Sequence, residues 1–188
     1  QSPLYQSRVL GEFPQEGTDT LIHLDWVDKC RNIEIEEDED EGTLKITAAD
    51  VARYGEDKTA IIDRKGHTFY GIEIREKIPT TMTSGIIKRH YEKEESDSLV
   101  VDDDGIGGGV VDMLSEQKIG VWPFKGGTRQ KAIDSHRFTN LRSQFYWYVA
   151  KKFEKGLYSL KKIPQREYEI IKNQLCSIKY IIDFMGRI

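Results

Sequence analysis

The sequence predicts an α/β domain with a central mixed β-sheet, an antiparallel meander joined by parallel strands, flanked by helices. Three observations lead to this prediction. Residues 44–78 alternate apolar and polar side chains at period two, which is typical of half-buried strands. Residues 80–124 alternate helical patterns with short apolar runs, the order of β-α-β units in parallel sheets. Residues 138–175 show apolar positions at helical spacing.

The meander occupies the first part of the predicted sheet. We expect its strands at 44–51, 59–63 and 67–78, with turns at Gly55 and Gly66 between them. The β-α-β part follows, with a helix at 80–94, a buried strand at 98–102, a helix at 106–118 and a strand at 119–124.

The C-terminal part is predicted to be mainly helical. One amphipathic helix is marked by Phe138, Leu141, Phe145 and Val149, a second runs from Pro164 through Leu175, and a last strand is expected at 177–182. Before the sheet, residues 1–33 are expected to form an ordered, turn-rich lead-in. Residues 34–41 hold seven carboxylates in eight positions and are expected to be a solvated loop or linker.

The composition is that of a single globular domain. The chain has 188 residues, of which 38% are hydrophobic and 32% charged. Its net charge of −4 conceals a division, because residues 1–117 carry 13 basic and 27 acidic side chains whereas residues 118–188 carry 15 and 5. The basic part is compatible with phosphate binding. Its candidate contacts are Lys125, Arg129, Lys131, Arg137, Arg142, Lys151, Lys152, Lys155, Lys161 and Lys162.

Several function classes lack their signature in this sequence. No apolar run approaches the ~20 residues that span a bilayer. Cys30 and Cys176 show no spacing typical of a zinc site or a disulfide framework. The phosphate-binding pattern GxxxxGK[ST] and the nucleophile pattern GxSxG do not occur.

Acidic residues close two of the predicted strands. Asp50 ends the first strand, and Asp102, Asp103 and Asp104 follow the buried strand 98–102. Carboxylates at strand ends are costly without a partner, and paired carboxylates are ligands that Mg²⁺ or Mn²⁺ prefers. If the two strands are neighbours, Asp50 and Asp102 converge, with Asp102 the first choice of ligand. Asp57 lies in a turn and could reach the same side, although a turn aspartate is also common for local hydrogen bonding. The structural alternative is that all these residues are helix caps and turn residues.

Two further features are weaker indications of a site. The glycine run Gly107, Gly108 and Gly109 could cradle a phosphate, but close packing of helix against strand is favoured. The four histidines, His23, His67, His90 and His136, show no ligand spacing and are interpreted as surface or core residues.

Together these residues resemble a known family. The segment from Ile46 to Thr59, followed by that from Val100 to Asp112, resembles the C-terminal nuclease domain of the large terminase subunit of tailed bacteriophages. The flanks agree, because Arg8 to Pro14 and Leu21 to Trp26 resemble the lead-in from the packaging ATPase. Asn140 to Trp147 resembles a later helix of the family.

The resemblance implies an RNase H-like fold over residues 44–188, after a lead-in and acidic linker over residues 1–43. It implies a metal-dependent endonuclease that cuts concatemeric viral double-stranded DNA during packaging, with Asp50 and Asp102 as catalytic carboxylates. Two Mg²⁺ or Mn²⁺ ions would be held by Asp50 and Asp102, with Asp57 or Asp104 in support. A third ligand and the end of the domain are expected beyond Ile188, since Asp183 fits the family pattern poorly.

The resemblance also implies the surroundings in which the domain works. Its partners would be double-stranded DNA, the ATPase domain of the same polypeptide, and the portal and small subunit of the packaging machine, without a membrane. The location would be the host cytoplasm. DNA contacts are expected at Lys125, Arg129, Lys131, Arg137 and Arg142.

Three other functions remain open at the level of sequence. Another RNase H-like nuclease, of the resolvase or transposase type, would share the metal chemistry but not the lead-in. A non-catalytic DNA-binding or assembly module would use the aspartates structurally. An actin-like ATPase would carry a duplicated subdomain, which a chain of this length leaves little room for.

Overall fold

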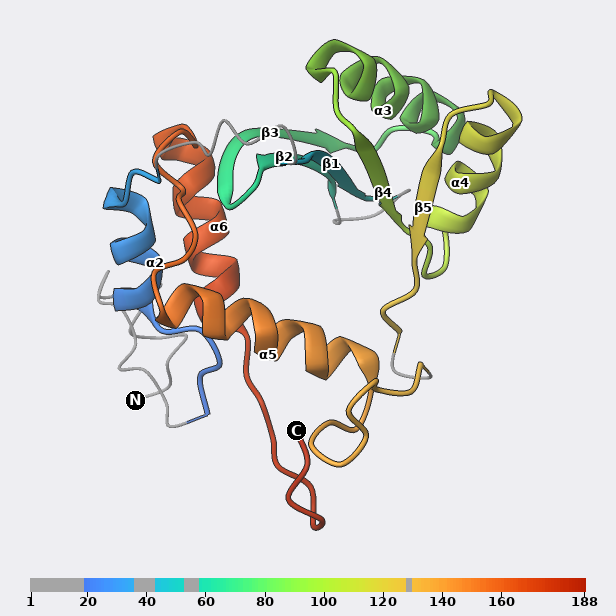
Figure 1. Cartoon of the computed structure of the whole chain (residues 1–188). Coiled ribbons are helices and arrows are strands. Elements are labelled where there is room, and N and C mark those ends of the chain that lie inside the picture. The colour runs from blue at the N-terminus through green and yellow to red at the C-terminus, as the bar shows by residue number, and fades with distance from the viewer. Residues whose placement is uncertain (1–18, 36–42, 53–57, 128–129) are drawn as a thin grey trace.

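A five-stranded mixed sheet forms the centre of the molecule (Figure 1). The computed structural model describes residues 19–35, 43–52, 58–127 and 130–188. The strands are β1 (Lys45–Asp50), β2 (Lys58–Lys65), β3 (Thr68–Glu76), β4 (Ser98–Asp102) and β5 (Val121–Phe124), in the order β3-β2-β1-β4-β5. β1, β2 and β3 pair antiparallel, whereas β1 with β4 and β4 with β5 pair parallel. The predicted fold class is therefore confirmed.

Helices lie on both sides of this sheet. They are α2 (Leu24–Asn32), α3 (Thr80–Glu94), α4 (Gly107–Glu116), α5 (Leu141–Glu154) and α6 (Gln165–Ser177). Figure 1 shows α3 and α4 together on one side, and α2, α5 and α6 on the other. We call the two sides of the sheet the α3 face and the α5 face. Among the described residues, no helix combines the length and the apolar character needed to cross a membrane.

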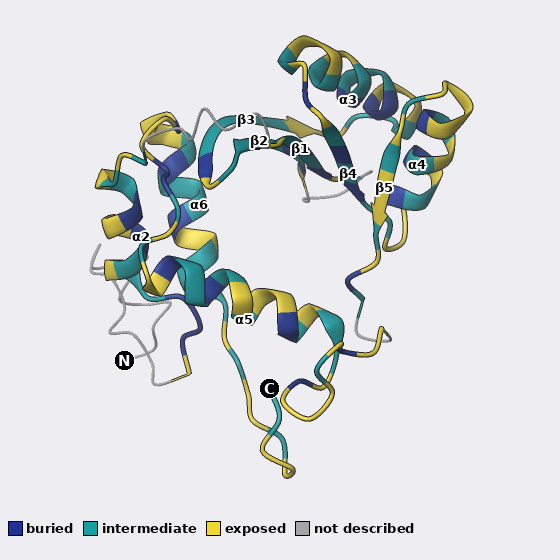
Figure 2. Ribbon diagram, in the orientation of Figure 1, coloured by how far each residue is buried: buried dark blue, intermediate teal, exposed yellow. Residues whose placement is uncertain are grey.

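Two apolar clusters hold these layers together (Figure 2). The cluster on the α3 face consists of Ala49, Ile61, Ile87, Leu99, Val101, Val110 and Leu114. The second joins the helices of the α5 side and consists of Leu21, Ile22, Val27, Cys30, Ala150, Phe153, Leu160, Ile163 and Tyr168. Each fully buried aliphatic side chain contributes ~1.5–3 kcal/mol, so these clusters dominate the stability of the domain.

The second cluster includes part of the predicted lead-in. Leu21, Ile22 and Val27 pack with α5 and α6, so residues 19–33 share a core with the C-terminal helices. The division of the chain at 43/44 stays a prediction. Most of the acidic run lies outside the described residues, and its first member, Glu34, forms an ion pair of 2.5 Å with Lys161.

Two predicted elements differ from the structure. The turn-rich lead-in contains the helix α2, because Val27 and Cys30, three positions apart, bury one helical face. The prediction of a strand at 177–182 is wrong. Lys179 makes a single bridge to Thr20, and Ile181 and Ile182 are exposed. A period-two pattern indicates extended chain, but a strand also needs a neighbour along its whole length.

Helix α5 begins with a side-chain cap rather than at Phe138, which is buried just before it. The Asn140 Oδ1 atom accepts a hydrogen bond of 2.9 Å from the Ser143 backbone N–H. We expect Asn140→Ala to lower the free energy of unfolding by ~1 kcal/mol, which denaturant titration would detect. Asn140→Ser should retain most of the stability, and equal losses in both variants would contradict a capping role.

Candidate functional site

The sheet brings Asp50 and Asp102 to the same edge. β1 and β4 are parallel neighbours whose last paired residues are Ala49 and Val101, and each strand ends one residue later, on an aspartate. One further step of this register sets Asp50 beside Asp102, on strands ~4.8 Å apart. Register partners in parallel strands point to the same face, so both carboxylates leave the sheet on one side.

That side is the α5 face. Ala49, Leu99 and Val101 are buried against α3 and α4, so the alternate positions, which include both aspartates, point the other way. Asp50 is exposed and Asp102 half-buried. The beginning of α5 lies nearby, because Arg142 is 3.6 Å from the Asp104 carboxylate and the Phe145 ring is 5.5 Å from that of Phe124.

The turn after β4 is held tightly. The backbone N–H of Asp103 donates to the Phe124 carbonyl at 2.8 Å, and that of Asp104 donates to Asp102 Oδ1 at 2.9 Å. Gly105 then takes a positive φ of 73°, a conformation that favours glycine. The bond from Asp104 orients the Asp102 carboxylate, and the bond from Asp103 ties the turn to β5.

The glycine run permits close packing. A Cβ atom on Gly107 would lie 1.6 Å from the Asp102 carbonyl oxygen, and one on Gly108 would lie 2.8 Å from Asp103 Oδ1. The collision with backbone at Gly107 leaves no room for a side chain where α4 starts against the end of β4, whereas at Gly108 the neighbour is a side-chain carboxylate. This supports the packing interpretation of the glycines over a phosphate cradle.

Basic side chains compensate two of the three consecutive aspartates. Lys125 Nζ is 3.1 Å from Asp103 Oδ2, and Arg142 pairs with Asp104. Two residues expected to contact DNA therefore contact the acidic turn. Of the other three, Lys131 and Arg137 are exposed, and Arg129 lies outside the described residues.

The donor set at this edge suits a hard divalent cation, because both converging groups are carboxylates. No three His, Cys, Asp or Glu side chains in the described ranges are placed to share one ion. Asp57 lies outside those ranges. Asp183 caps a turn instead, accepting hydrogen bonds of 2.8 and 2.9 Å from the N–H groups of Met185 and Arg187. These bonds help to lower its pKa.

The opposite face of the sheet carries a polar cluster that sequence reasoning missed. Asp63, 1% exposed in the middle of β2, is 2.7 Å from His90 Nε2 and accepts a 2.7 Å hydrogen bond from Thr47 Oγ1. The His90 Nδ1 atom is 3.1 Å from Glu73 Oε2, and Glu73 also pairs with Arg75 at 2.7 Å. A groove of about 570 Å³ opens above this cluster, on the other side of the sheet from Asp50 and Asp102.

The charges in this cluster are mutually stabilised. Burial opposes a charged His90, but hydrogen bonds and charge from Asp63, and then Glu73, outweigh it and raise the pKa of the imidazole. Burial likewise opposes the Glu73 carboxylate, but Arg75 and His90 outweigh it and lower its pKa. The signal in the sequence was strand parity, because Asp63 shares the buried face of β2 with Ile61.

The fold has known counterparts, although no protein-family model and no curated protein matches the sequence. The nuclease domain of the large terminase subunit gp2 of bacterial virus Sf6 superposes with a TM-score of 0.75 at 17% identity, covering 89% of this chain and 86% of that one. A mutant of that domain, with manganese and beta-thujaplicinol, gives a TM-score of 0.77 at 17% identity and the same coverage.

The large terminase nuclease from thermophilic phage G20c is also similar. Its TM-score is 0.64 at 15% identity, covering 90% of this chain and 87% of that one. A structure of the same nuclease with bound magnesium gives a TM-score of 0.60, at 15% identity and a coverage of 91% and 86%. The chain shares its fold with these domains, and the RNase H-like architecture expected from the sequence is confirmed.

Proposed function

We propose that this chain is a metal-dependent endonuclease that cuts concatemeric viral double-stranded DNA during genome packaging. The observation that carries the proposal is the placement of Asp50 and Asp102 at the ends of two adjacent parallel strands, on one face. The shared fold supports it, and the solved counterparts with bound manganese and magnesium support a divalent cation as cofactor.

Asp50 and Asp102 would hold the metal, with Asp104 beside them and Asp57 as a further candidate. Two bound Mg²⁺ or Mn²⁺ ions would supply a water of lowered pKa and stabilise the charge on the displaced oxygen of the phosphodiester. The chain's own residues prepare this site. The Asp104 N–H orients the Asp102 carboxylate, and Lys125 and Arg142 offset the charge of Asp103 and Asp104, which would otherwise repel DNA.

The basic C-terminal part would hold the DNA backbone without reading its sequence. Four of the five proposed DNA contacts are described, namely Lys125 at the edge of the acidic turn, Lys131, Arg137 and Arg142, and Arg129 is the fifth. An ATPase domain in the same polypeptide, a portal and a small terminase subunit are proposed as partners in the host cytoplasm.

The test is cleavage of supercoiled plasmid in Mg²⁺, Mn²⁺ or EDTA. We expect cutting that requires metal, and a loss of at least ~100-fold in rate for Asp50→Asn and for Asp102→Asn, since even the loss of an outer partner of a metal ligand costs ~10–100-fold. Asp112→Asn removes an exposed carboxylate from α4 and is the matched control. Circular dichroism would verify that each variant is folded.

Two results would reject the nuclease proposal. Cutting that continues in EDTA, or in both aspartate variants, would assign it to a contaminant or to another site. DNA binding with no cutting in any metal would instead favour a DNA-binding or assembly module, in which the aspartates only shape the turn.

A further inference from the structure

Three basic side chains meet where the turn between β2 and β3 approaches the end of α5. They are Arg64, His67 and Lys152, and we call them the basic cluster. The Lys152 Nζ atom is 3.2 Å from His67 Nε2. The Arg64 guanidinium folds back over the turn and donates from Nη1 to the carbonyl oxygen of Gly66.

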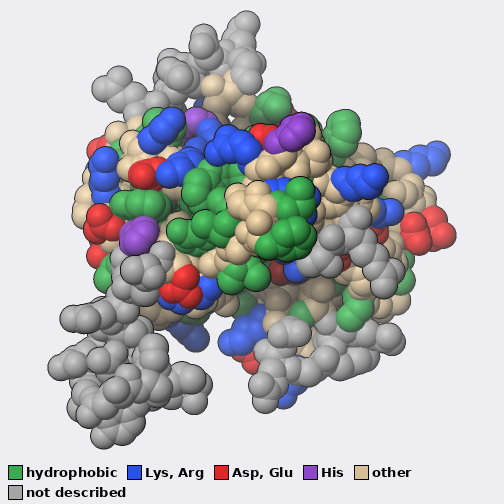
Figure 3. All heavy atoms as spheres, turned by 90° about the horizontal axis from the view of Figure 1, so that it is seen from below, with side chains coloured by type: hydrophobic (Ala, Val, Ile, Leu, Met, Phe, Trp, Pro, Cys, Tyr) green, Lys and Arg blue, Asp and Glu red, His purple; other side chains and the backbone are tan. Residues whose placement is uncertain are grey.

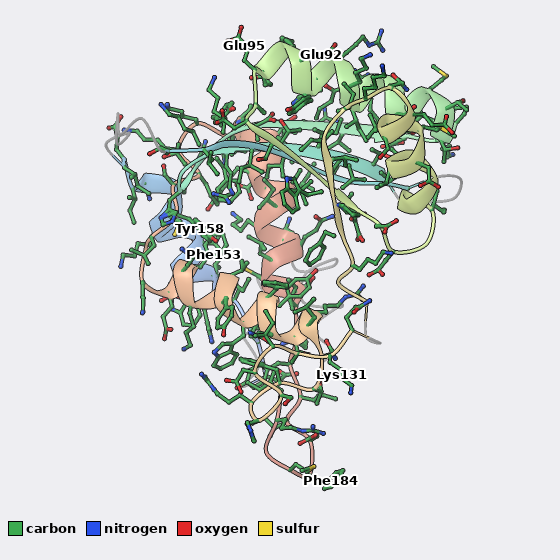
Figure 4. All side chains as sticks on the ribbon, turned by 45° about the vertical axis from the view of Figure 1, so that its right-hand side comes forward. Glu92, Glu95, Lys131, Phe153, Tyr158 and Phe184 are labelled. Atoms are coloured by element: carbon green, nitrogen blue, oxygen red, sulfur yellow. The ribbon has the colours of Figure 1, made fainter. Side chains whose placement is uncertain are left out.

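An aromatic floor supports the basic cluster. The centre of the Tyr158 ring lies 5.8 Å from that of the His67 ring and 5.7 Å from Lys152 Nζ. Figure 4 shows Tyr158 and Phe153 close together at this end of α5, and their ring centroids are 5.1 Å apart. The basic cluster therefore packs on the ring of Tyr158, which is itself packed against Phe153.

Within the part of the chain that the structure describes, no acidic side chain balances the positive charge of the basic cluster. Among the described residues, no carboxylate lies within ion-pair distance of Arg64 or Lys152, and the neighbouring Glu154 pairs with Lys151 at 2.7 Å. More widely, Lys and Arg side chains gather with apolar ones across the face seen from below (Figure 3). A lysine bonded to an imidazole, with an arginine held over the adjoining turn, offers charged donors that suit a phosphate group.

The protonation of His67 fits an anion site. An ammonium group can only donate, so Nε2 accepts from Lys152 and a neutral ring carries its proton on Nδ1. Burial first, and then the charges of Lys152 and Arg64, lower the pKa of His67. An arriving anion would offset these charges and favour the protonated ring, which adds a third positive charge.

We propose that the basic cluster binds a phosphate group, and that this group is a backbone phosphodiester of the DNA substrate, some distance from the bond that is cut. The assignment to DNA rests on the proposed function. Binding of the phosphate group itself rests on Arg64, His67 and Lys152 alone.

The position of the cluster relative to Asp50 supports a second contact on the same DNA. In the pairing of β1 with β2, Arg64 lies opposite Ile46 and Ala60 lies opposite Asp50. The two pairs are four residues apart, so Arg64 and Asp50 are separated by ~13 Å along the strands. By strand parity, Arg64 points to the α5 face, as Asp50 does.

Helix α5 gives an independent measure. Arg142, near the start of α5, pairs with Asp104. Lys152 lies ten residues later, so these two residues are ~15 Å apart along the helix axis. Both estimates correspond to about four nucleotides at ~3.4 Å per nucleotide of duplex. The cluster is thus placed to hold the backbone about four nucleotides from the proposed cleavage point.

The test measures binding of a short duplex in EDTA over a range of salt concentrations. Lys152→Gln should weaken binding about fivefold at 0.15 M salt and reduce the slope of log K against log[salt] by ~0.9, the contribution of one phosphate contact. Arg64→Gln/Lys152→Gln should lose more, and Lys152→Arg should restore most of the affinity. Arg64 also braces the turn, so the conclusion depends on the Lys152 variants.

The matched control is Lys88→Gln/Arg89→Gln, which removes one lysine and one arginine from α3. This helix lies on the opposite side of the sheet from Tyr158, as the labelled Glu92 and Glu95 show (Figure 4). If only net charge mattered, DNA binding would weaken equally in this control and in Arg64→Gln/Lys152→Gln. That result would overturn the proposal.

A second measurement follows the His67 ring by NMR with inorganic phosphate alone. We expect phosphate to raise the pKa of His67 in the wild type and not in Lys152→Gln. Absence of this response would overturn the anion site, whether or not the protein cuts DNA. A response to phosphate without any loss of DNA affinity in the variants would overturn the assignment to DNA. Failure of the wild type to bind or cut DNA would count against the proposed function, and the phosphate titration would still decide the anion site.

Discussion

Gly107→Ala is expected to prevent stable folding of the sheet edge that carries Asp102. The added Cβ would lie 1.6 Å from the Asp102 carbonyl oxygen and 2.7 Å from its carbonyl carbon. Overpacking costs ~1–3 kcal/mol where side chains can yield, and we expect more than ~4 kcal/mol here because the neighbour is backbone. The variant should show a large loss of unfolding free energy in urea, with no metal-dependent cleavage from any folded fraction.

The control lies two residues further along the same helix. A Cβ on Gly109 would meet nothing within 4 Å, so Gly109→Ala should leave the fold intact and stabilise α4 by up to ~1 kcal/mol through helix propensity. If both variants were equally stable, close approach of α4 to β4 would not be the reason for the glycine.

Asp63→Asn is expected to lower the free energy of unfolding by ~3–5 kcal/mol, the usual cost of breaking a buried ion pair by removing one partner. Asp63 is 1% exposed and bonds both His90 and Thr47, so its loss leaves the imidazolium without its closest carboxylate. Chemical denaturation at pH 6 would measure the change. Asp112→Asn, an exposed change of the same kind, should stay within ~0.5 kcal/mol of the wild type.

The same cluster predicts a pH dependence with a definite sign. Because the folded-state pKa of His90 is raised above 6.5, its stabilising contribution is complete below that pH and is lost as the pH rises through the folded value. Because the pKa of Glu73 is lowered from 4.5, its contribution is present above that pH and is lost as the pH falls through the folded value. The cluster should stabilise the fold most between pH 4.5 and 6.5.

His90→Gln tests this sign. The difference in unfolding free energy between wild type and variant should be greatest near pH 6 and should shrink as the pH rises above 6.5. A difference that is constant from pH 5 to 9 would show that His90 acts through packing and not through its charge.

Much of the fold was determined by local sequence. Apolar spacing located α3 at residues 80–94 and β4 at 98–102, because helical and strand periods are properties of short segments. Strand parity and the placement of Asp50 and Asp102 at strand ends also followed from sequence alone. The resemblance to terminase nuclease domains depended on these same residues.

The tertiary structure decided which segments meet. The parallel pairing of β1 with β4 sets Asp50 beside Asp102, and no local pattern specifies that pairing. Asp63 and His90, and equally His67 and Lys152, are brought together from distant elements. Residues 177–182 alternate like a strand, yet among the described residues they form one bridge, between Lys179 and Thr20. Local periodicity determines whether a segment is extended or helical. Long-range packing selects its neighbours, because hydrogen bonds and charge pairs act over a few ångströms of space and are indifferent to separation along the chain.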